Sequence, residues 1–300
     1  MVSWKVGNVR ITRVVELEAQ WPGTELLPSA TPEALAKEND WLFPHFTDDS
    51  GQIKLSVHTL IVESQGKRLL VDTCIGNDKE RKAFPQWDHL QLPFLKALED
   101  AGSPRQSVDR VICTHLHVDH VGWNTRLVDG RWVPTFPQAR YVFAATEVDY
   151  WRHTAYPADD PIFGDSIAPI LDAGLAELTP VDHEVCQGVR LDFTPGHTPG
   201  HVSIVVECGG ERAVITGDMI HTPLQIADVD LSSAFDFDRR AAAQTRREFL
   251  NRYRDDTLVI GTHWGGPGAG RVTADTDGRW AVEPTPSQLP SRPDEDAQRM

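Results

Sequence analysis

The chain of 300 residues is 40% hydrophobic and carries a formal net charge of −15 at pH 7. This length and apolar content can bury a sizeable core, and they exclude a fibrous or wholly disordered chain. The acidic charge argues against nucleic acid as a partner, because proteins that bind nucleic acid need a clustered basic surface.

The first half of the chain predicts strands around one irregular segment. Alternating or apolar runs predict four strands: Val9–Leu17, Val57–Glu63, Arg68–Asp72 and Val108–Cys113. Residues 20–52 are irregular and rich in Pro and Trp, with a short helical pattern at Pro32–Glu38. Helical spacing over Leu90–Ala101 ends at Gly102, directly before the strand that leads into the histidine cluster described below.

Along the whole chain the strands come in two groups, each followed by helices, which predicts two sheets packed face to face with helices outside. Trp132–Tyr141 carries two prolines and predicts an edge hairpin that leads into Val142 and Phe143. Four further strands are expected: Val189–Thr194, Val202–Glu207, Ala213–Thr216 and Thr257–Ile260. Three helices are expected: Glu147–His153, Ile167–Leu178 and Asp238–Tyr253, the last capped by Asp236 or Asp238. Residues 1–283 should form a single domain, and residues 284–300 a flexible polar tail.

The cysteines and the apolar segments predict a soluble, cytoplasmic protein. Cys74, Cys113, Cys186 and Cys208 form no CxxC pair, which is typical of free thiols in a reducing compartment. The first residues lack the apolar core of a signal peptide, and no apolar run is long enough to span a membrane.

Residues 114–120, Thr-His-Leu-His-Val-Asp-His, concentrate three imidazoles and one carboxylate directly after a predicted strand. Alternate side chains of an extended stretch share a face, so His115 and His117 can reach one point together. Asp119 and His120 follow where the strand turns, so they can face a neighbouring point. Imidazole and carboxylate groups are ligands that zinc and similar divalent metals prefer. A His-rich surface turn is the alternative, disfavoured because further ligand candidates follow.

Strong His and Asp candidates stand at the C-terminal ends of four predicted strands: His115, His197, Asp218 and His263. Loops that leave one edge of a sheet are where ligands from distant parts of a sequence can converge. One strand-end histidine is more often a packing residue, but four such positions flanked by Gly or Thr indicate a metal site.

The motif series His115-x-His117-x-Asp119-His120, with His197, Asp218 and His263, resembles that of the metallo-β-lactamase-fold superfamily over most of the chain. The resemblance implies an α/β fold, the four-layer αββα sandwich, and two divalent ions, with zinc as the default and iron, manganese or cobalt as alternatives. The implied ligands are His115, His117 and His197 for one ion, Asp119, His120 and His263 for the other, and Asp218 between them. An oxygen ligand at 218 is similar to the dinuclear branches, such as lactonases, and differs from several lactam-hydrolysing members.

Two such ions would share a hydroxide near neutral pH, which would attack a carbonyl carbon or a phosphorus. Asp119 could orient this nucleophile and later pass a proton to the leaving group. His221 stands where quorum-quenching lactonases that resemble this protein carry a tyrosine that assists at the substrate carbonyl. A histidine there looks more like the methyl parathion hydrolase-type branch. We predict that His221 donates a hydrogen bond to the substrate, with packing beneath the metal loop as the alternative.

Two further polar residues are expected behind the ligands. Asp72 resembles the carboxylate that orients a ligand histidine in this fold, and a strand-end turn is its other reading. His201 repeats the Gly-His pattern of His197, but in the family pattern the first histidine binds the metal. We therefore expect His201 to support or pack against the site without binding a metal.

The aromatic residues of the segment 20–52 suggest a lid over a substrate cavity. Trp41, Phe43 and Phe46 lie in a stretch too irregular for a core strand, and such aromatics usually need burial. We predict that some of them line the cavity together with Trp123, which follows the metal motif. Ordinary packing is the alternative.

The sequence as a whole predicts a dinuclear metal-dependent hydrolase of small neutral esters, with lactones first. An organophosphate triesterase is the alternative within enzymes, and a metal-binding scaffold without turnover is the alternative outside them. The expected partner is a small-molecule ester or lactone, without nucleic acid or membrane, and the relatives suggest a homodimer.

Overall fold

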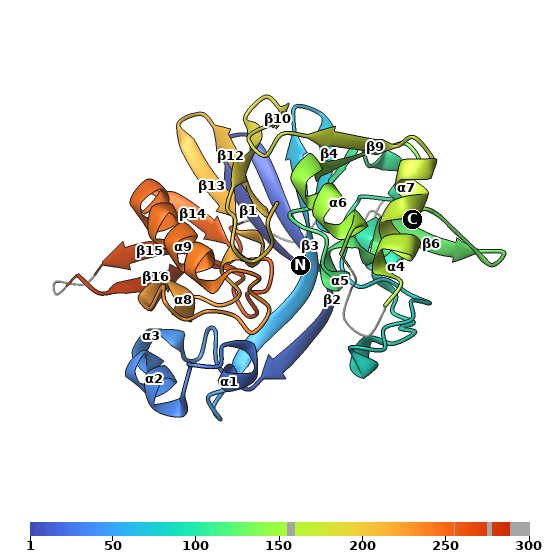
Figure 1. Cartoon of the computed structure of the whole chain (residues 1–300). Coiled ribbons are helices and arrows are strands. Elements are labelled where there is room, and N and C mark those ends of the chain that lie inside the picture. The colour runs from blue at the N-terminus through green and yellow to red at the C-terminus, as the bar shows by residue number, and fades with distance from the viewer. Residues whose placement is uncertain (155–159, 255, 275–277, 289–300) are drawn as a thin grey trace, which may run out of the picture.

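The computed structural model describes residues 1–154, 160–254, 256–274 and 278–288. Two seven-stranded sheets form its centre (Figure 1). In hydrogen-bonded order, the first sheet consists of β1 (Val2–Val6), β2 (Val9–Trp21), β3 (Ile53–Ser64), β4 (Lys67–Val71), β5 (Arg110–Ile112), β8 (Arg140–Ala144) and β9 (Ala176–Thr179). The second consists of β10 (Glu184–Cys186), β11 (Val189–Phe193), β12 (Val202–Cys208), β13 (Glu211–Ile215), β14 (Thr257–Ile260), β15 (Ala269–Ala274) and β16 (Trp280–Pro284).

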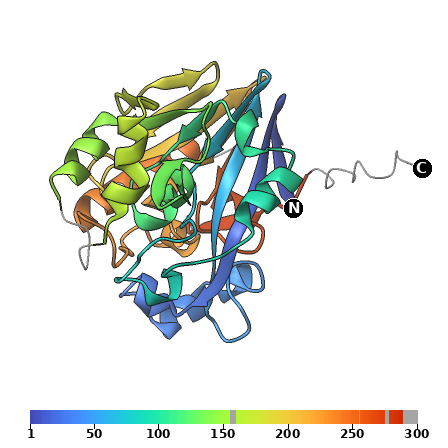
Figure 2. The ribbon, with the colours of Figure 1, turned by 90° about the vertical axis from the view of Figure 1, so that its right-hand side faces the viewer.

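Helices cover the outer faces of both sheets. The first sheet is covered by α4 (Phe94–Asp100), α6 (Ala145–Arg152) and α7 (Ala168–Asp172). The second is covered by α8 (Leu224–Ala227) and α9 (Arg239–Tyr253). Three short helices, α1 (Gly23–Leu26), α2 (Pro32–Lys37) and α3 (Asn39–Leu42), gather at one end of the long strands β2 and β3 (Figures 1 and 2).

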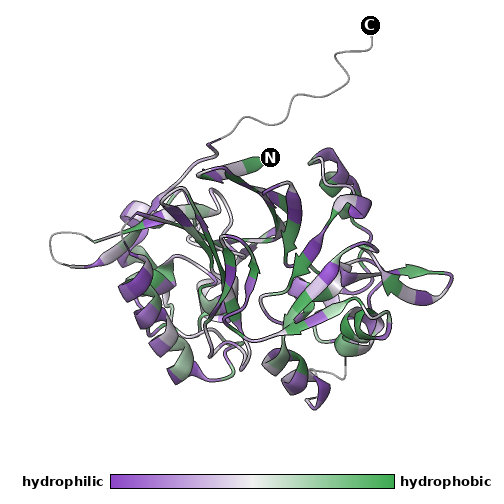
Figure 3. Ribbon diagram, turned by 90° about the horizontal axis from the view of Figure 1, so that it is seen from above, coloured by the Kyte–Doolittle hydropathy of each residue, from purple (hydrophilic) through white to green (hydrophobic). Residues whose placement is uncertain are grey.

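Three apolar layers hold these elements together, because the central strands are buried on both faces. In β4, Leu69 and Val71 point into the layer between the sheets, while Leu70 points toward the helices of the first sheet. β14 repeats the pattern, with Val259 alone turned toward α8 and α9. Figure 3 shows the strands of both sheets between helices, with many hydrophobic segments in the strands and many hydrophilic ones in the helices. The predicted four-layer αββα sandwich is therefore confirmed.

Strand direction brings the predicted ligand positions to one place. β4 and β5 are parallel neighbours in the first sheet, and β13 and β14 are parallel neighbours in the second. β11 runs in the same direction as β13, because both are antiparallel to β12 between them. The carboxyl ends of these strands therefore open onto shared edges, and the loops that leave them can meet between the sheets.

Several predicted elements differ from the structure. The helix expected over Ile167–Leu178 ends at Asp172, because Gly174 turns the chain with a φ of 67° and Ala176 then begins β9. The edge hairpin expected from Trp132 is a separate pair, β6 (Thr125–Val128) with β7 (Arg131–Pro134), and β8 is an interior strand between β5 and β9. Asp238 caps α9, accepting hydrogen bonds from the backbone N–H groups of Arg240 and Ala241.

The first residues of the predicted polar tail are hydrogen-bonded to strands. The backbone N–H of Gln288 donates to the carbonyl of Ser3, and that of Thr285 donates to the carbonyl of Ala269, so residues 284–288 run along ordered strands. The rest of the predicted tail, 289–300, lies outside the described residues. None of the helices in the described part of the chain combines the length and apolar content that crossing a membrane requires.

Candidate metal centre

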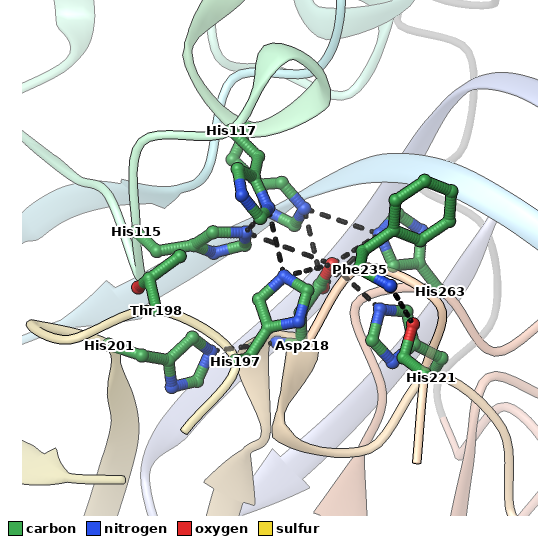
Figure 4. A network of polar contacts seen from close by, with 12 residues as sticks. His115, His117, His197, Thr198, His201, Asp218, His221, Phe235 and His263 are labelled. Atoms are coloured by element: carbon green, nitrogen blue, oxygen red, sulfur yellow. Dashed lines mark hydrogen bonds and ion pairs between the residues drawn. The ribbon is translucent and has the colours of Figure 1, made fainter. Parts of the chain in front are cut away.

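The structure brings all seven predicted ligands together in two adjoining groups. Figure 4 labels five of them: His115, His117, His197, Asp218 and His263. Within each group, one ligand atom from every residue lies within 4.8 Å of the others. The first group consists of His115, His117, His197 and Asp218, and the second of Asp119, His120 and His263. They reach the site from the β5–α5 loop, α5 (Val118–Val121) and the loops after β11, β13 and β14. Residues up to 148 positions apart in sequence, from 115 to 263, thus share one site.

The spacing in the first group fits a tetrahedral ion. His117 Nδ1 lies 3.0 Å from His115 Nε2 and 2.9 Å from His197 Nε2. Asp218 Oδ2 lies 3.8 Å from His115 Nε2 and 3.5 Å from His197 Nε2. Zinc bonds of about 2.0–2.1 Å at tetrahedral angles place neighbouring ligand atoms about 3.3 Å apart, so these residues fit such an ion.

The second group has similar spacing and shares Asp218 with the first. His263 Nε2 lies 3.2 Å from His120 Nε2 and 3.3 Å from Asp119 Oδ2. Asp218 Oδ1 lies 3.3 Å from His120 Nε2 and 3.2 Å from His263 Nε2. The two oxygens of Asp218 therefore face both groups, which is the arrangement that a bridging carboxylate requires.

Four of the five histidines have one ring nitrogen held by an acceptor, which leaves the other free to bind a cation. In each case Nδ1 faces the acceptor and Nε2 faces the cluster. The pairs are His115 with Thr114 Oγ1 at 3.1 Å, His120 with Asp72 Oδ2 at 2.8 Å, His197 with Asp236 Oδ1 at 3.1 Å and His263 with the carbonyl of Ser56 at 3.3 Å. His117 alone turns Nδ1 toward the other ligands. The free ring nitrogens and the carboxylate oxygens are thus oriented to coordinate a cation.

The protonation of the two groups differs. Burial lowers the pKa of His115, His117 and His197 well below the ordinary histidine value, so all three stay neutral, which is the form that binds metals. In the second group burial acts in the same direction, but the surrounding carboxylates together outweigh it. Asp218, Asp72 and Asp119 raise the pKa of His120 well above the ordinary value, and Asp218 and Asp119 raise the pKa of His263. The carboxylates around His120 and His263 thus favour positive charge at this group, which a bound cation would supply.

Asp72 and His201 lie behind the ligands, as the sequence suggests. Asp72 accepts from the backbone N–H of Thr114 at 2.8 Å and holds His120, and its φ of 58° is a left-handed conformation that aspartate tolerates. His201 Nε2 accepts from the backbone N–H of Asp218 at 2.9 Å, and it lies outside both ligand groups. A Cβ on Gly217 would stand 2.5 Å from His201 Nε2, so a glycine is required there.

Two carboxylates beside the site were missed by the sequence reasoning. Asp236 was considered only as a helix cap, but it is buried and bonds His197, while its second oxygen accepts from the backbone N–H of Ser233. Glu16 accepts from the backbone N–H of Ile75 and from Trp123 Nε1, next to the turn that carries Asp119. The only signal in the sequence is a glutamate within an apolar strand. In the structure, the β2–β3 register shifts at this glutamate.

A largely apolar cavity of about 330 Å³ opens onto the metal centre. Its polar lining residues are five of the seven candidate ligands and one further histidine: His117, Asp119, His197, Asp218 and His263, with His221. The remaining walls are aliphatic or aromatic: Leu17, Ala19, Trp21, Leu26, Leu55, Val57, Phe84, Trp87, Val118, Trp151, Ile162, Ala234 and Phe235. Trp21 and Leu26 come from the segment predicted as a lid, and the other walls come from elsewhere in the fold.

The four aromatics predicted as cavity walls do not line this cavity, so that prediction is wrong. Phe46 is buried in the core against Trp264, and Trp123 is buried and stacks on Phe94. Trp41 is half-buried and donates to Glu38, while Phe43 lines a separate surface hollow. Phe46 and Trp123 therefore contribute to core packing, where their rings are removed from water.

His221 lies in the cavity next to the bridging carboxylate. Its Nε2 is 3.3 Å from Asp218 Oδ2, and its backbone N–H donates to Gln225 Oε1 at 2.8 Å. Its Nδ1 is buried without a hydrogen-bond partner among the described residues. Nε2 is thus the ring nitrogen that faces Asp218, and both residues line the cavity.

Comparison with known proteins points to one family. Residues 53–263 match the family described as the metallo-beta-lactamase superfamily. An N-acyl homoserine lactonase from Bacillus sp is 32% identical over 168 residues, which cover 52% of this chain and 60% of that protein. This chain thus spans less than two thirds of that relative. An N-acyl homoserine lactonase from Bacillus thuringiensis is 30% identical over 197 residues, which cover 61% of this chain and 72% of the relative.

Solved structures agree on the fold. AidC, described as a dizinc quorum-quenching lactonase in complex with a product, superposes with a TM-score of 0.71 at 22% identity. The match covers 94% of this chain and 96% of AidC. A hydrolase named AbOPH, described as a member of the beta lactamase superfamily, superposes with a TM-score of 0.75 at 22% identity, covering 95% of this chain and 97% of its own. At this identity the likeness establishes the fold alone.

Proposed function

Because this chain belongs to the metallo-β-lactamase superfamily, we propose that it is a metal-dependent hydrolase of small, uncharged esters, with lactones as the preferred substrates. Two observations support the reaction class: the His/Asp cluster can hold metal ions, and relatives at 30–32% identity are lactonases. Two divalent ions, with zinc first, are proposed for the two ligand groups.

The observation that carries the substrate class is the chemistry of the cavity wall. Apart from the candidate ligands and His221, the lining residues are aliphatic or apolar aromatic and contain no charged side chain. A substrate with its own charge would lose hydration on entry without gaining an ionic partner from the wall. An uncharged ester with apolar substituents instead buries its surface against these residues. We therefore expect a poor response to esters that carry a carboxylate or a phosphate.

Different residues of the chain have different roles in the proposed reaction. Bound ions would lower the pKa of a water molecule and polarise the ester carbonyl. Asp119 lines the cavity, and a carboxylate oxygen there can accept the proton of the attacking water and return it to the leaving oxygen. His221 Nε2 faces the same space and can donate a hydrogen bond to the oxygen on which charge develops. The apolar walls exclude competing water.

Hydrolysis by zinc-loaded protein of a matched panel tests this proposal. The panel contains γ-lactones with uncharged apolar substituents, the same lactones with a carboxylate, an aryl ester, a thioester and a phosphotriester. We expect the highest kcat/KM for the uncharged lactones and a steep loss for the charged ones. Zinc-loaded protein that hydrolyses none of these compounds would leave the non-catalytic scaffold as the better account.

An organophosphate triesterase is the second candidate. It is favoured by His221 in the cavity and by the aromatic walls Trp21, Phe84, Trp87 and Phe235, which suit an aryl leaving group. A phosphotriester is also uncharged, so the apolar cavity accepts it on the same argument. A kcat/KM for the phosphotriester above that for every lactone in the panel would favour this function.

A further inference from the structure

Glu147 is a buried carboxylate that joins two loops of the metal centre without touching a ligand. It lies in the first turn of α6 and is 1% exposed. Its Oε1 accepts from the backbone N–H of Leu116 at 3.2 Å and from Trp151 Nε1 at 2.7 Å. Its Oε2 accepts from Thr198 Oγ1 and from the backbone N–H of Gly200, both at 2.8 Å.

These four donors come from three segments around the first ligand group: the loop of His115 and His117, the loop after His197, and α6. Leu116 stands between His115 and His117, while Thr198 and Gly200 follow His197. The carboxylate thus ties together the loops that supply all three histidines of the first ligand group. Trp151 adds the cavity wall, because its ring packs edge-on against His117 with the centroids 5.4 Å apart.

The close packing at Gly200 shows that the loop is built onto this carboxylate. A Cβ on Gly200 would stand 2.4 Å from the backbone nitrogen of Glu147 and 2.7 Å from its Cα, so only glycine fits. The loop therefore lies directly on the first turn of α6, where its backbone N–H reaches Oε2. Burial raises the pKa of Glu147, while the four hydrogen bonds favour the ionised form.

We propose that Glu147 is a positioning residue that sets the separation of His117 and His197 and thereby selectively strengthens metal binding by the first ligand group. The inference rests on the proposed metal centre but not on its substrate. Carboxylates behind metal ligands commonly change metal affinity about 10–100-fold when they are replaced, although they touch no ion. Glu147 acts one step further back, through the backbone of two ligand loops.

The substitution Glu147→Gln tests this geometry, because an amide cannot accept four hydrogen bonds at these positions. If the amide nitrogen took the Oε1 position, it would face two N–H groups, of Leu116 and Trp151, that can only donate. At the Oε2 position it would face Thr198, whose hydroxyl can accept, and Gly200, whose N–H would lose its partner. The second orientation is less costly, so the loop that carries His197 should be released.

The matched control is Asp165→Asn, which removes another buried carboxylate. Asp165 is 3% exposed and pairs with Arg81 at 2.7 Å and with Lys79 at 3.3 Å. Within the described part of the chain, its carboxylate has no hydrogen bond or ion pair with a ligand loop. It should lower the melting temperature without changing zinc affinity. Thr198→Val removes a single donor of similar shape and should have a smaller effect in the same direction as Glu147→Gln.

Zinc binding to the apo-protein is measured by competition with a chromophoric chelator, and the side-chain nitrogens of the histidines are followed by NMR. We expect Glu147→Gln to bind one zinc ion about 10–100-fold more weakly, with the loss seen at His117 and His197 and not at His120 and His263. Two wild-type affinities in a less stable Glu147→Gln protein, or equal losses in both groups, would overturn the proposal.

If Glu147→Gln does not fold, Thr198→Val decides: wild-type zinc affinity at His197 overturns the proposal, and a selective loss supports it. Because no ester is used, failure of the proposed substrate class leaves this result standing. A wild-type chain that binds no zinc would instead overturn the metal centre and this inference together.

Discussion

The candidate metal centre and the cavity wall beside it differ in the residues that form them and in where these residues lie in the sequence. The centre uses polar residues on strand-end loops, and four of its histidines are each held by an acceptor behind the ring. The wall uses apolar residues from β2, β3, α6 and the segments around Phe84 and Phe235, which share no motif. The proposed reaction thus depends on the positions of a few atoms, whereas selectivity depends on surface that can change without moving them.

This division makes the bridging residue the most sensitive position. Asp218→Ala removes the oxygens that face both ligand groups, so activity should fall to background and at least one ion should be lost. Elemental analysis after purification with excess zinc, together with lactone hydrolysis, measures both effects. Retention of two tightly bound ions by this variant would contradict a bridging role.

His221 should contribute to turnover but not to metal content. Loss of one hydrogen-bond donor to a developing oxyanion typically lowers kcat about 10²–10³-fold, and we expect this for His221→Ala. Zinc content should stay at the wild-type level, because His221 lies outside both ligand groups. The alternative is packing, in which case a thermal melt shows destabilisation while kcat per folded molecule is unchanged.

Asp72 should affect the metals from behind the site. Asp72→Asn puts an amide against His120 Nδ1 and the backbone N–H of Thr114, so one of the two contacts is lost. We expect zinc affinity at the second group to fall about 10–100-fold. Zinc titration of the apo-protein checks this, and Asp165→Asn again serves as the control for general destabilisation. Unchanged affinity would reduce Asp72 to a turn residue.

Substitutions in the cavity wall should mainly change the Michaelis constant. Trp21→Ala removes a wall of the cavity, so KM for lactones with large apolar substituents should rise roughly tenfold while kcat changes little. Phe46→Ala is the matched core variant, because Phe46 is buried against Trp264 and lies outside the cavity. It should cost about 3–5 kcal/mol of unfolding free energy and leave the substrate ranking unchanged. The reverse pattern would restore Phe46 as a wall residue.

His201 should have the smallest effect on activity. Burial lowers the pKa of His201 to about 4, so it is neutral and accepts the backbone N–H of Asp218. His201→Ala leaves that N–H without its partner and should cost about 1–3 kcal/mol of stability, while both ions are retained. Metal analysis and a melt separate these outcomes, and loss of an ion would identify His201 as a ligand.

The ligands could be predicted because their signal is local in sequence. His115, His117, Asp119 and His120 fall within six positions after a buried strand, and the other three each follow an apolar strand and a Gly or Thr. Asp236 and Glu147 could not be found in this way, because neither stands in a motif. Asp236 contacts His197, 39 residues away in the chain, and Glu147 contacts Thr198, 51 residues away.

The sequence by itself determined the layers, the strand-end positions of the candidate ligands and their nitrogen and oxygen donor types, because apolar periodicity and residue type act over a few residues. Only the tertiary structure decided which aromatics face the cavity and which fill the core. Trp21 and Phe46 belong to the same irregular segment, yet one lines the cavity and the other packs against Trp264. Burial of an aromatic ring is favourable in either place, so composition alone does not distinguish them. The choice depends on how β2, β3 and the second sheet meet.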